Sequence, residues 1–224
     1  MSKIFVVSID GPAASGKSTV SRLLAEKLKC SWLSTGIFYR GLAFLVNKLQ
    51  ADPSQIKDVL SLLKKQDWEV KMSLKETSFY YKKTNYNLDL KGEDIGALAS
   101  LLAVNPDIRL ALLDEQRKMK HLAKNFFIAE GRDCSSVVFP ESNLKVFISA
   151  SLEDRAKRRS LETGSSEILV KTQQKQRDKQ DSLRKTAPLE IHKQALLINS
   201  SLYSATEIVD RLYTEIQKLL QTKK

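Results

Sequence analysis

An uninterrupted apolar stretch followed at once by a glycine-containing loop constrains this chain more than any other feature. Residues 4–9 read Ile-Phe-Val-Val-Ser-Ile, and Asp10 and Gly11 end the run. A β-branched, continuously apolar run is typical of a parallel strand that is buried on both faces. From Lys17 onward, apolar residues recur at steps of three and four, which predicts a helix that begins inside the loop. We therefore expect a strand, a glycine loop and a helix in that order.

The loop between this strand and helix matches the pattern G-x-x-x-x-G-K-[ST] completely over residues 11–18. In such a loop, inward-turned backbone N–H groups and the helix N-terminus hold phosphate oxygens without bulky side chains. The expected ATP-binding residues are Gly11, Pro12, Ala13, Ala14, Ser15, Gly16, Lys17, Ser18 and Thr19. We expect Lys17 to reach the β- and γ-phosphates and the Ser18 hydroxyl to bind Mg²⁺. The alternative is a turn that binds nothing, which the flanking strand and helix disfavour.

Composition and charge narrow the class of protein further. The 224 residues are 42% hydrophobic and 28% charged, which describes a folded domain rather than a disordered chain. The net charge of +11 favours anionic partners, among them nucleotides, nucleic acid and acidic lipid. Cys30 and Cys134 cannot build a disulfide framework, and reduced thiols suit the cytoplasm. No segment resembles a signal sequence or a membrane span, so we expect a cytoplasmic monomer without a membrane partner.

Strand and helix patterns alternate along the rest of the chain. Helices are expected over residues 36–49, 53–65, 94–104, 107–122 and 206–220, and buried strands over 126–129, 146–149 and 195–198. Short, partly exposed strands over 68–72, 79–82 and 87–90 predict a small β insert at 67–91. The alternation indicates an α/β fold, in which a mostly parallel central sheet is covered by helices on both sides.

Charged residues gather at three further places. Arg132 and Asp133 follow the predicted strand at 126–129, at the sheet edge where ligands of such folds bind. Two predicted helices carry, on one face each, Arg155, Arg158 and Arg159 in the first and Arg177, Asp181 and Arg184 in the second. Guanidinium groups make planar, bidentate contacts with phosphate. Each group alone would fit a solvated face or a local ion pair, but the phosphate loop favours a function.

At this point the sequence resembles the bacterial-type cytidylate kinases, which belong to the nucleoside monophosphate kinase group of P-loop proteins. The matching segments are residues 9–18, 34–40, 130–133, 137–140, 149–159, 177–184 and 187–189. The likeness runs almost end to end, and these segments in this order are much more specific than the phosphate loop alone. The resemblance implies transfer of the γ-phosphoryl group of ATP to CMP or dCMP, with Mg²⁺ as cofactor.

The resemblance also implies a domain organisation and a set of site residues. It implies one P-loop kinase domain over 1–224 in three α/β/α layers, with a monophosphate-binding region at 35–105 and a helical lid at 153–170. The implied catalytic residues are Lys17, Arg132, Arg155, Arg158, Arg177 and Arg184. The implied substrate-binding residues are Thr35, Arg40, Ser100, Arg109, Arg132, Asp133, Arg177, Asp181 and Arg184.

The chain departs from the family pattern at two places. After residues 92–95 it reaches Ser100 early, so a few residues are missing beside the substrate pocket. Ser135 and Ser136 stand where Gly-Thr is common in the family. We expect the neighbouring Cys134 to be a small packing residue rather than a redox switch.

The expected mechanism is in-line phosphoryl transfer by positioning and charge neutralisation, with a lid that excludes water. Such a mechanism needs no strong general base, which suits a chain with only two histidines. A kinase for another nucleoside monophosphate is the nearest alternative. An RNA-binding protein switched by nucleotide is a weaker one, because the cations cluster at predicted nucleotide sites and no RNA-binding motif is present. We therefore expect small nucleotides, and no stable nucleic acid, as partners.

Overall fold

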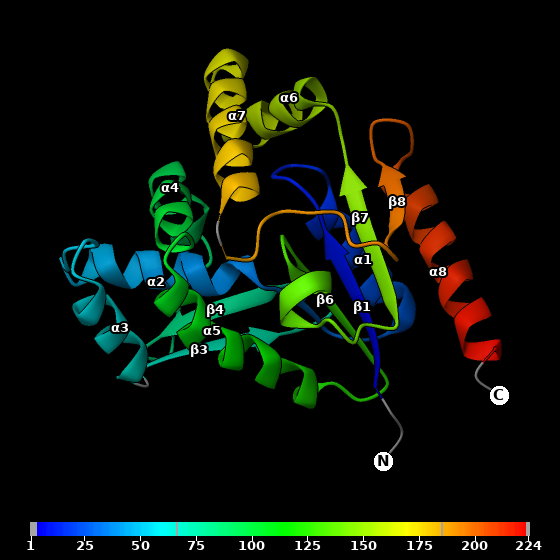
Figure 1. The fold of residues 1–224 in the computed structure, drawn as a ribbon, viewed down its shortest axis with the longest axis horizontal. Coiled ribbons are helices and arrows are strands. Elements are labelled where there is room, and N and C mark those ends of the chain that lie inside the picture. The colour runs from blue at the N-terminus through cyan, green and yellow to red at the C-terminus, as the bar shows by residue number, and fades with distance from the viewer. Residues whose placement is uncertain (1–3, 66, 185, 223–224) are drawn as a thin grey trace.

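A five-stranded parallel sheet forms the centre of the computed structural model, which describes residues 4–65, 67–184 and 186–222 (Figure 1). The strands are β1 (Phe5–Asp10), β2 (Trp32–Ser34), β6 (Phe126–Gly131), β7 (Leu144–Ser149) and β8 (Leu196–Asn199). Their order across the sheet is β2-β6-β1-β7-β8, and every neighbouring pair is parallel. The carboxyl ends of all five strands therefore lie along one edge of the sheet.

Helices cover both faces of this sheet. One face packs against α1 (Lys17–Leu28) and α8 (Ala205–Gln221) in a core that includes Ile9, Leu24 and Leu212. The other face shares a core with α2 (Gly36–Lys48) and α5 (Pro106–Lys118), and α3 (Ile56–Lys64) and α4 (Glu93–Leu102) pack against α2 in the same core. Successive residues of a strand point to opposite faces, so Val6 belongs to the second core and Val7 to the first. The predicted three-layer α/β/α fold is confirmed.

A second sheet of three antiparallel strands forms the β insert. Its strands are β3 (Trp68–Met72), β4 (Thr77–Tyr81) and β5 (Thr84–Asn85), in that order. The strand predicted over 87–90 is wrong, because Lys82 and Lys83 take positive φ angles of 48° and 68° and turn the chain back at once. The hairpin therefore closes at β5, and Asp89–Lys91 forms the 3₁₀ turn η1.

Aromatic side chains attach this insert to the main core. Phe79 is 1% exposed and lies 6.2 Å from the ring centroid of Phe44 on α2. Tyr81 is buried as well. These rings pack inward from β4, which is the middle strand of the three.

Outside the β insert, two of the described elements have no counterpart among the predicted ones. The strand β2 has only three residues, too few for a periodicity to show. A single π-helical turn, η3 (Cys134–Val138), follows β6. In addition, α3 begins at Ile56 instead of Pro53, because the Asp52 carboxylate accepts a hydrogen bond from the Ser54 N–H (2.8 Å) and holds a turn there.

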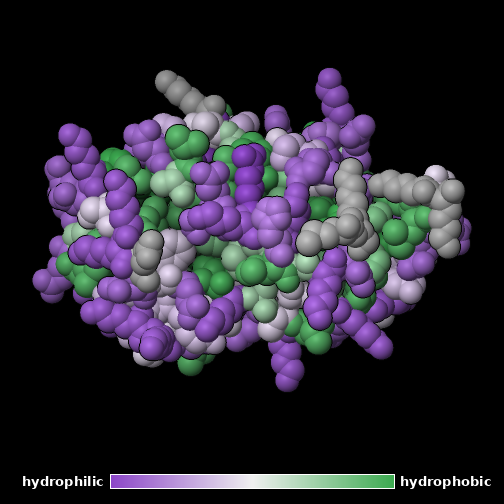
Figure 2. All heavy atoms as spheres, turned by 90° about the horizontal axis from the view of Figure 1, so that it is seen from below, coloured by the Kyte–Doolittle hydropathy of each residue, from purple (hydrophilic) through white to green (hydrophobic). Residues whose placement is uncertain are grey.

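Two helices, α6 (Leu152–Thr163) and α7 (Glu167–Leu183), stand above the carboxyl ends of β1 and β7 (Figure 1). Hydrophilic side chains cover most of the rim of the face shown in Figure 2, with hydrophobic residues visible between them.

Among the described residues, no single helix has the length and apolar character to cross a membrane. Within the described ranges, one pair of helices, α4 and residues 106–122 with a bend of 104° between them, passes that test together by length and composition.

Candidate active site

A cleft of about 900 Å³ lies at the carboxyl edge of the central sheet. Its volume is in the range of small-molecule sites. The predicted site residues that line it are Ala13, Ala14, Gly16, Lys17, Ser18, Thr19, Thr35, Arg40, Ser100, Arg109, Arg132, Asp133, Arg158, Arg159, Arg177, Asp181 and Arg184. Four predicted residues, Gly11, Pro12, Ser15 and Arg155, are not among its lining residues. The fold therefore brings together side chains that are spread over more than 160 positions of sequence.

The phosphate loop is shaped by two glycines with positive φ angles. Gly11 has a φ of 150°, and a Cβ atom placed on it would lie 2.1 Å from the backbone oxygen of Ile148 in β7. Gly16 has a φ of 89° and caps the N-terminus of α1. The Ser15 carbonyl accepts a hydrogen bond from the Ser200 hydroxyl (2.8 Å), which ties the loop to the end of β8. Close contact with β7 and β8 thus fixes the loop on the sheet.

Lys17 lies at the base of this loop and is 4% exposed. Its Nζ donates to the Pro12 carbonyl (2.6 Å) and lies 3.5 Å from the Ser15 hydroxyl. Burial, followed by the positive charge of Arg132, lowers the pKa of Lys17 to about 7, although Glu130 and Asp10 act in the opposite direction. A phosphate group would supply the negative charge that this buried amine lacks.

Oxygen atoms suited to a hard cation meet next to Lys17. The Ser18 hydroxyl donates to Glu130 Oε1 (3.2 Å), and the Ser34 hydroxyl donates to the same carboxylate oxygen. Ser18 is exposed at the start of α1, whereas Glu130 is buried at the end of β6. Hydroxyl and carboxylate oxygens are ligands that Mg²⁺ prefers, with nucleotide oxygens and water filling its other positions. The residues present therefore fit a magnesium ion held beside the phosphate loop.

The opposite side of the cleft is lined by residues of α2, α4 and α5. Arg40 donates to the carbonyls of Leu90 and Gly92, so its guanidinium is fixed at the start of α4. Arg109 forms a buried ion pair with Asp133, and its guanidinium lies 5.6 Å from the ring centroid of Tyr39. These contacts place two cations and an aromatic ring on one wall of the cleft.

The hydroxyl groups predicted on this side are engaged within the protein. The Thr35 hydroxyl donates to the Glu130 carbonyl (2.9 Å), and the Ser100 hydroxyl donates to the Gly96 carbonyl (3.0 Å) one turn earlier in α4. Thr35 is 3% exposed. Both residues line the cleft, and the Thr35 hydroxyl oxygen also lies 3.7 Å from Cys134 Sγ. The Ser100 hydroxyl oxygen has lone pairs that can accept from a ligand.

A carboxylate and three guanidinium groups face each other where α7 meets β6. Arg132 Nε donates to Asp181 Oδ2 (2.8 Å), and Arg184 Nη1 lies 3.8 Å from Asp181 Oδ1. Although burial acts to raise it, the surrounding guanidiniums hold the pKa of Asp181 below its ordinary value. Arg177 Nε and Arg184 Nη2 are buried and have no hydrogen-bond partner among the described residues. Unsatisfied buried donors at the wall of a cleft suit an anionic ligand.

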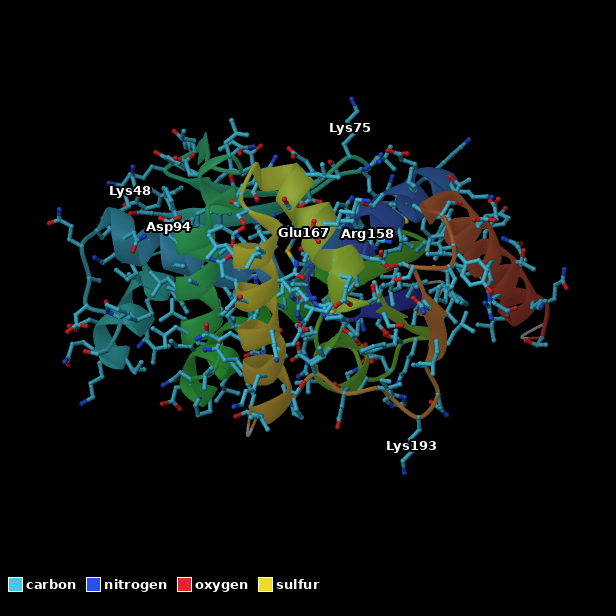
Figure 3. The ribbon with its side chains drawn as sticks, turned by 90° about the horizontal axis from the view of Figure 1, so that it is seen from above. Lys48, Lys75, Asp94, Arg158, Glu167 and Lys193 are labelled. Carbon is cyan, nitrogen blue, oxygen red and sulfur yellow. The ribbon has the colours of Figure 1, made fainter. Side chains whose placement is uncertain are left out.

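Two arginines of α6 flank the phosphate loop. Arg155 forms a two-point ion pair with Asp178 of α7 (3.2 and 2.6 Å) and donates to the Ala13 carbonyl (3.3 Å). Arg158 donates to the hydroxyl (3.0 Å) and carbonyl (2.6 Å) of Ser200. Figure 3 shows Arg158 in the middle of the molecule, whereas Lys193 projects from its edge. Arg155 therefore braces the loop from outside the cleft, and Arg158 lines the cleft itself.

Several residues of this arrangement have no predicted role. Glu130 accepts from Ser18 and Ser34, Asp178 holds Arg155, and Ser200 holds both Ser15 and Arg158. Glu130 and Ser200 each lie at the carboxyl end of a core strand, where polar residues point to the site. That position is the signal by which the sequence could have identified them.

A glycine loop around a buried lysine, with arginines from five other segments on the same cleft and a parallel sheet beneath, defines a P-loop kinase. The chain belongs to the cytidylate kinase family, whose family model, described as "Cytidylate kinase", matches residues 7–218. The resemblance seen in the sequence is thereby confirmed.

Two relatives agree with this assignment, and a solved structure shares the fold. The chain is 44% identical over 206 residues to a cytidylate kinase from Bdellovibrio bacteriovorus. This alignment covers 92% of this chain and 94% of the relative. It is 35% identical to a cytidylate kinase from Thermotoga petrophila, with 97% of this chain and 99% of the relative covered. A gluconokinase from Sinorhizobium meliloti shares the fold with a TM-score of 0.50 at 11% identity, over 97% of this chain and 94% of that one.

Proposed function

We propose that the protein transfers the γ-phosphoryl group of ATP to CMP or dCMP, giving ADP and CDP or dCDP. The observation that carries this proposal is one cleft that joins the phosphate loop around Lys17 with guanidinium donors of Arg177 and Arg184 that have no hydrogen-bond partner in the described part of the chain. A phosphoryl group passing between two nucleotides needs cations on both sides of its path. Membership of the cytidylate kinase family supports cytidine nucleotides as acceptors.

The donor and acceptor would lie on opposite sides of the cleft. The triphosphate of ATP would occupy the loop formed by residues 11–19, with Lys17 at its β- and γ-phosphates. The acceptor monophosphate would lie toward Arg40, Arg109 and Arg132. An oxygen of the acceptor phosphate then attacks the γ-phosphorus in line, and the bond from this phosphorus to the β–γ bridging oxygen breaks.

Residues that line the cleft would stabilise the charge on the transferred group. Lys17, Arg132, Arg158, Arg177 and Arg184 would surround it, and Arg155 would act through the loop. Ser18 and Glu130 would hold Mg²⁺, which supplies neutralisation of phosphate charge when bound.

We further propose that residues 153–170 act as the lid over this cleft and that residues 35–105 form the monophosphate-binding region. The ion pair between Arg159 of α6 and Glu93 of α4 supports this assignment, because it joins the two regions beside the cleft. A closed lid would exclude water from the transferred phosphoryl group.

A coupled assay of ADP release with CMP, dCMP, UMP and AMP as acceptors tests the proposed function. We expect kcat/KM for CMP and dCMP to exceed that for UMP and AMP by at least about tenfold, because a site built for polar groups rejects analogues that leave them unpaired. Equal turnover of UMP or AMP would identify a kinase for another monophosphate. Absent transfer combined with steeply salt-dependent RNA binding would favour the RNA-binding alternative.

A further inference from the structure

A buried carboxylate connects the phosphate loop to the loop that carries Arg132 and Asp133. Asp10 is the last residue of β1, directly before Gly11, and is 1% exposed. Its Oδ1 accepts a hydrogen bond from the Cys134 N–H (2.7 Å), and its Oδ2 accepts from the Ser135 N–H (2.8 Å) and the Ser135 hydroxyl (2.5 Å). One side chain of the first loop thus takes three hydrogen bonds from the second.

These N–H groups belong to the first turn of η3, directly after the cleft-lining pair Arg132 and Asp133. The first N–H groups of a helical turn have no partner within the turn and carry positive potential. The side chain of a Ser, Thr, Asp or Asn at the residue that begins the turn usually satisfies such groups. Here the carboxylate comes from Asp10, more than a hundred residues earlier, so the cap fixes one loop against the other.

Arg132 and Asp133, which directly precede the capped turn, each form one ion pair with another element that lines the cleft. Asp133 forms the buried ion pair with Arg109 on α5. Arg132 donates to Asp181 on α7 (2.8 Å). A shift of η3 relative to β1 would therefore move both connections while leaving the phosphate loop on the sheet.

Resting on the proposed function, we propose that Asp10 and Ser135 are positioning residues that set the acceptor-binding groups Arg132 and Asp133 in register with the phosphate loop. Neither Asp10 nor Ser135 lines the cleft, so both act through their neighbours. The Ser135 hydroxyl is a feature of this chain, because glycine is common at this position in the family that the sequence resembles. It adds a side-chain hydrogen bond to the two from the backbone.

Two substitutions separate this role from simple stabilisation. Ser135→Ala removes the hydroxyl alone, and Asp10→Asn places an amide NH₂ group against donors that need an acceptor. The matched control is Ser142→Ala, which removes a hydroxyl that donates to the Phe139 carbonyl (2.6 Å) just beyond the same turn. The measurements are KM for CMP, KM for ATP, kcat, the melting temperature, and amide hydrogen exchange at Cys134 and Ser135.

We expect Ser135→Ala to raise KM for CMP about threefold to tenfold, as loss of one hydrogen bond would, with KM for ATP within about twofold of its original value. Asp10→Asn should have a larger effect in the same direction, lower kcat, and speed amide exchange at residues 134 and 135. Ser142→Ala should leave both KM values unchanged.

Two other results would count against the inference, and they are distinguishable. A lower melting temperature with an unchanged KM for CMP in both variants would show that the contact only stabilises the fold, which overturns the positioning role alone. A wild-type protein that phosphorylates neither CMP nor dCMP would overturn the proposed function, and this inference with it.

Discussion

Arg159 on α6 and Glu93 at the start of α4 form an ion pair beside the cleft, with Arg159 Nε 2.9 Å from Glu93 Oε1. Arg159 Nη2 also approaches the Lys91 carbonyl (3.5 Å). These contacts hold the helix that carries Arg155 and Arg158 against the segment that fixes Arg40. The structure therefore describes an arrangement in which the two sides of the cleft are tied together.

Substitution Glu93→Gln should weaken this connection. Both side chains are partly exposed, so the pair contributes at most about 1 kcal/mol, and added salt should reduce that contribution. We expect KM for both nucleotides to rise about twofold to fivefold at low salt, with a smaller effect at high salt. Glu26→Gln, which breaks the exposed pair with Arg22 on α1, serves as the control. An equal effect of the two substitutions would argue against a role for Arg159 and Glu93 in closure.

Lys17→Ala should leave the fold intact and lower the rate of phosphoryl transfer by at least about a hundredfold, in line with the loss of one charge-stabilising group. Stopped assays of ADP formation with CMP as acceptor measure this loss, and circular dichroism checks the fold. Lys193→Ala provides a matched control, because this lysine projects from the edge of the molecule (Figure 3). Normal turnover in the Lys17 variant would refute the assigned role of the phosphate loop.

The lowered pKa of Lys17 predicts that nucleotide binding takes up a proton. In the nucleotide-free protein this pKa is about 7, against an ordinary value of 10.5. Between these two values the unfolded chain binds a proton that the folded chain lacks, so this group makes stability rise with pH from about 7 to about 10.5. A bound triphosphate favours the ammonium form and raises the pKa.

Calorimetry can measure this proton directly. We expect ATP binding at pH 8.5 to take up to about one proton, seen as a dependence of the binding enthalpy on the ionisation enthalpy of the buffer. Lys17→Met should abolish the uptake. Binding of wild-type protein without proton uptake would show that Lys17 is already charged in the free protein.

Gly11→Ala should destabilise the fold strongly. The new methyl group would lie 2.1 Å from the Ile148 carbonyl oxygen, and both partners belong to the rigid sheet edge. We expect a loss of at least about 2 kcal/mol in the free energy of unfolding, measured by chemical denaturation. Gly36→Ala is the comparison, because no atom lies within 4 Å of a Cβ at that position. A similar stability for both variants would contradict the close packing of the loop against β7.

Long periodic segments of the fold could be predicted from the sequence because each shows its pattern locally. The run that forms β1 and the spacing within α1 and α8 depend only on residues near one another. The strand β2 could not be predicted, because three residues cannot establish a period. The end of the insert was mispredicted because the turn at Lys82 and Lys83 uses positive φ angles in residues that do not signal them.

The residues of the site also divide into those that a local sequence pattern identifies and those that only the folded sheet brings together. The phosphate loop is contiguous, so its pattern identifies Lys17 and Ser18 directly. The partner of Ser18, Glu130, lies on a strand that is adjacent only in the folded sheet. No local pattern pairs Asp10 with Ser135 either, since their contact arises from the order of the strands. Sequence therefore identifies the cations of the cleft, and the structure identifies the groups that orient them.

The pairing of β1 with β6 places Asp10 directly opposite Gly131 in adjacent strands. The loops that would bind the donor and the acceptor therefore begin at paired residues of adjacent strands. Backbone hydrogen bonds between β1 and β6 fix the spacing between the two loops. A displacement of α6 or α7 would not alter this spacing, because neither helix belongs to the sheet. A change in the β insert, which forms a separate sheet, would therefore leave the spacing between the donor and acceptor loops as it is.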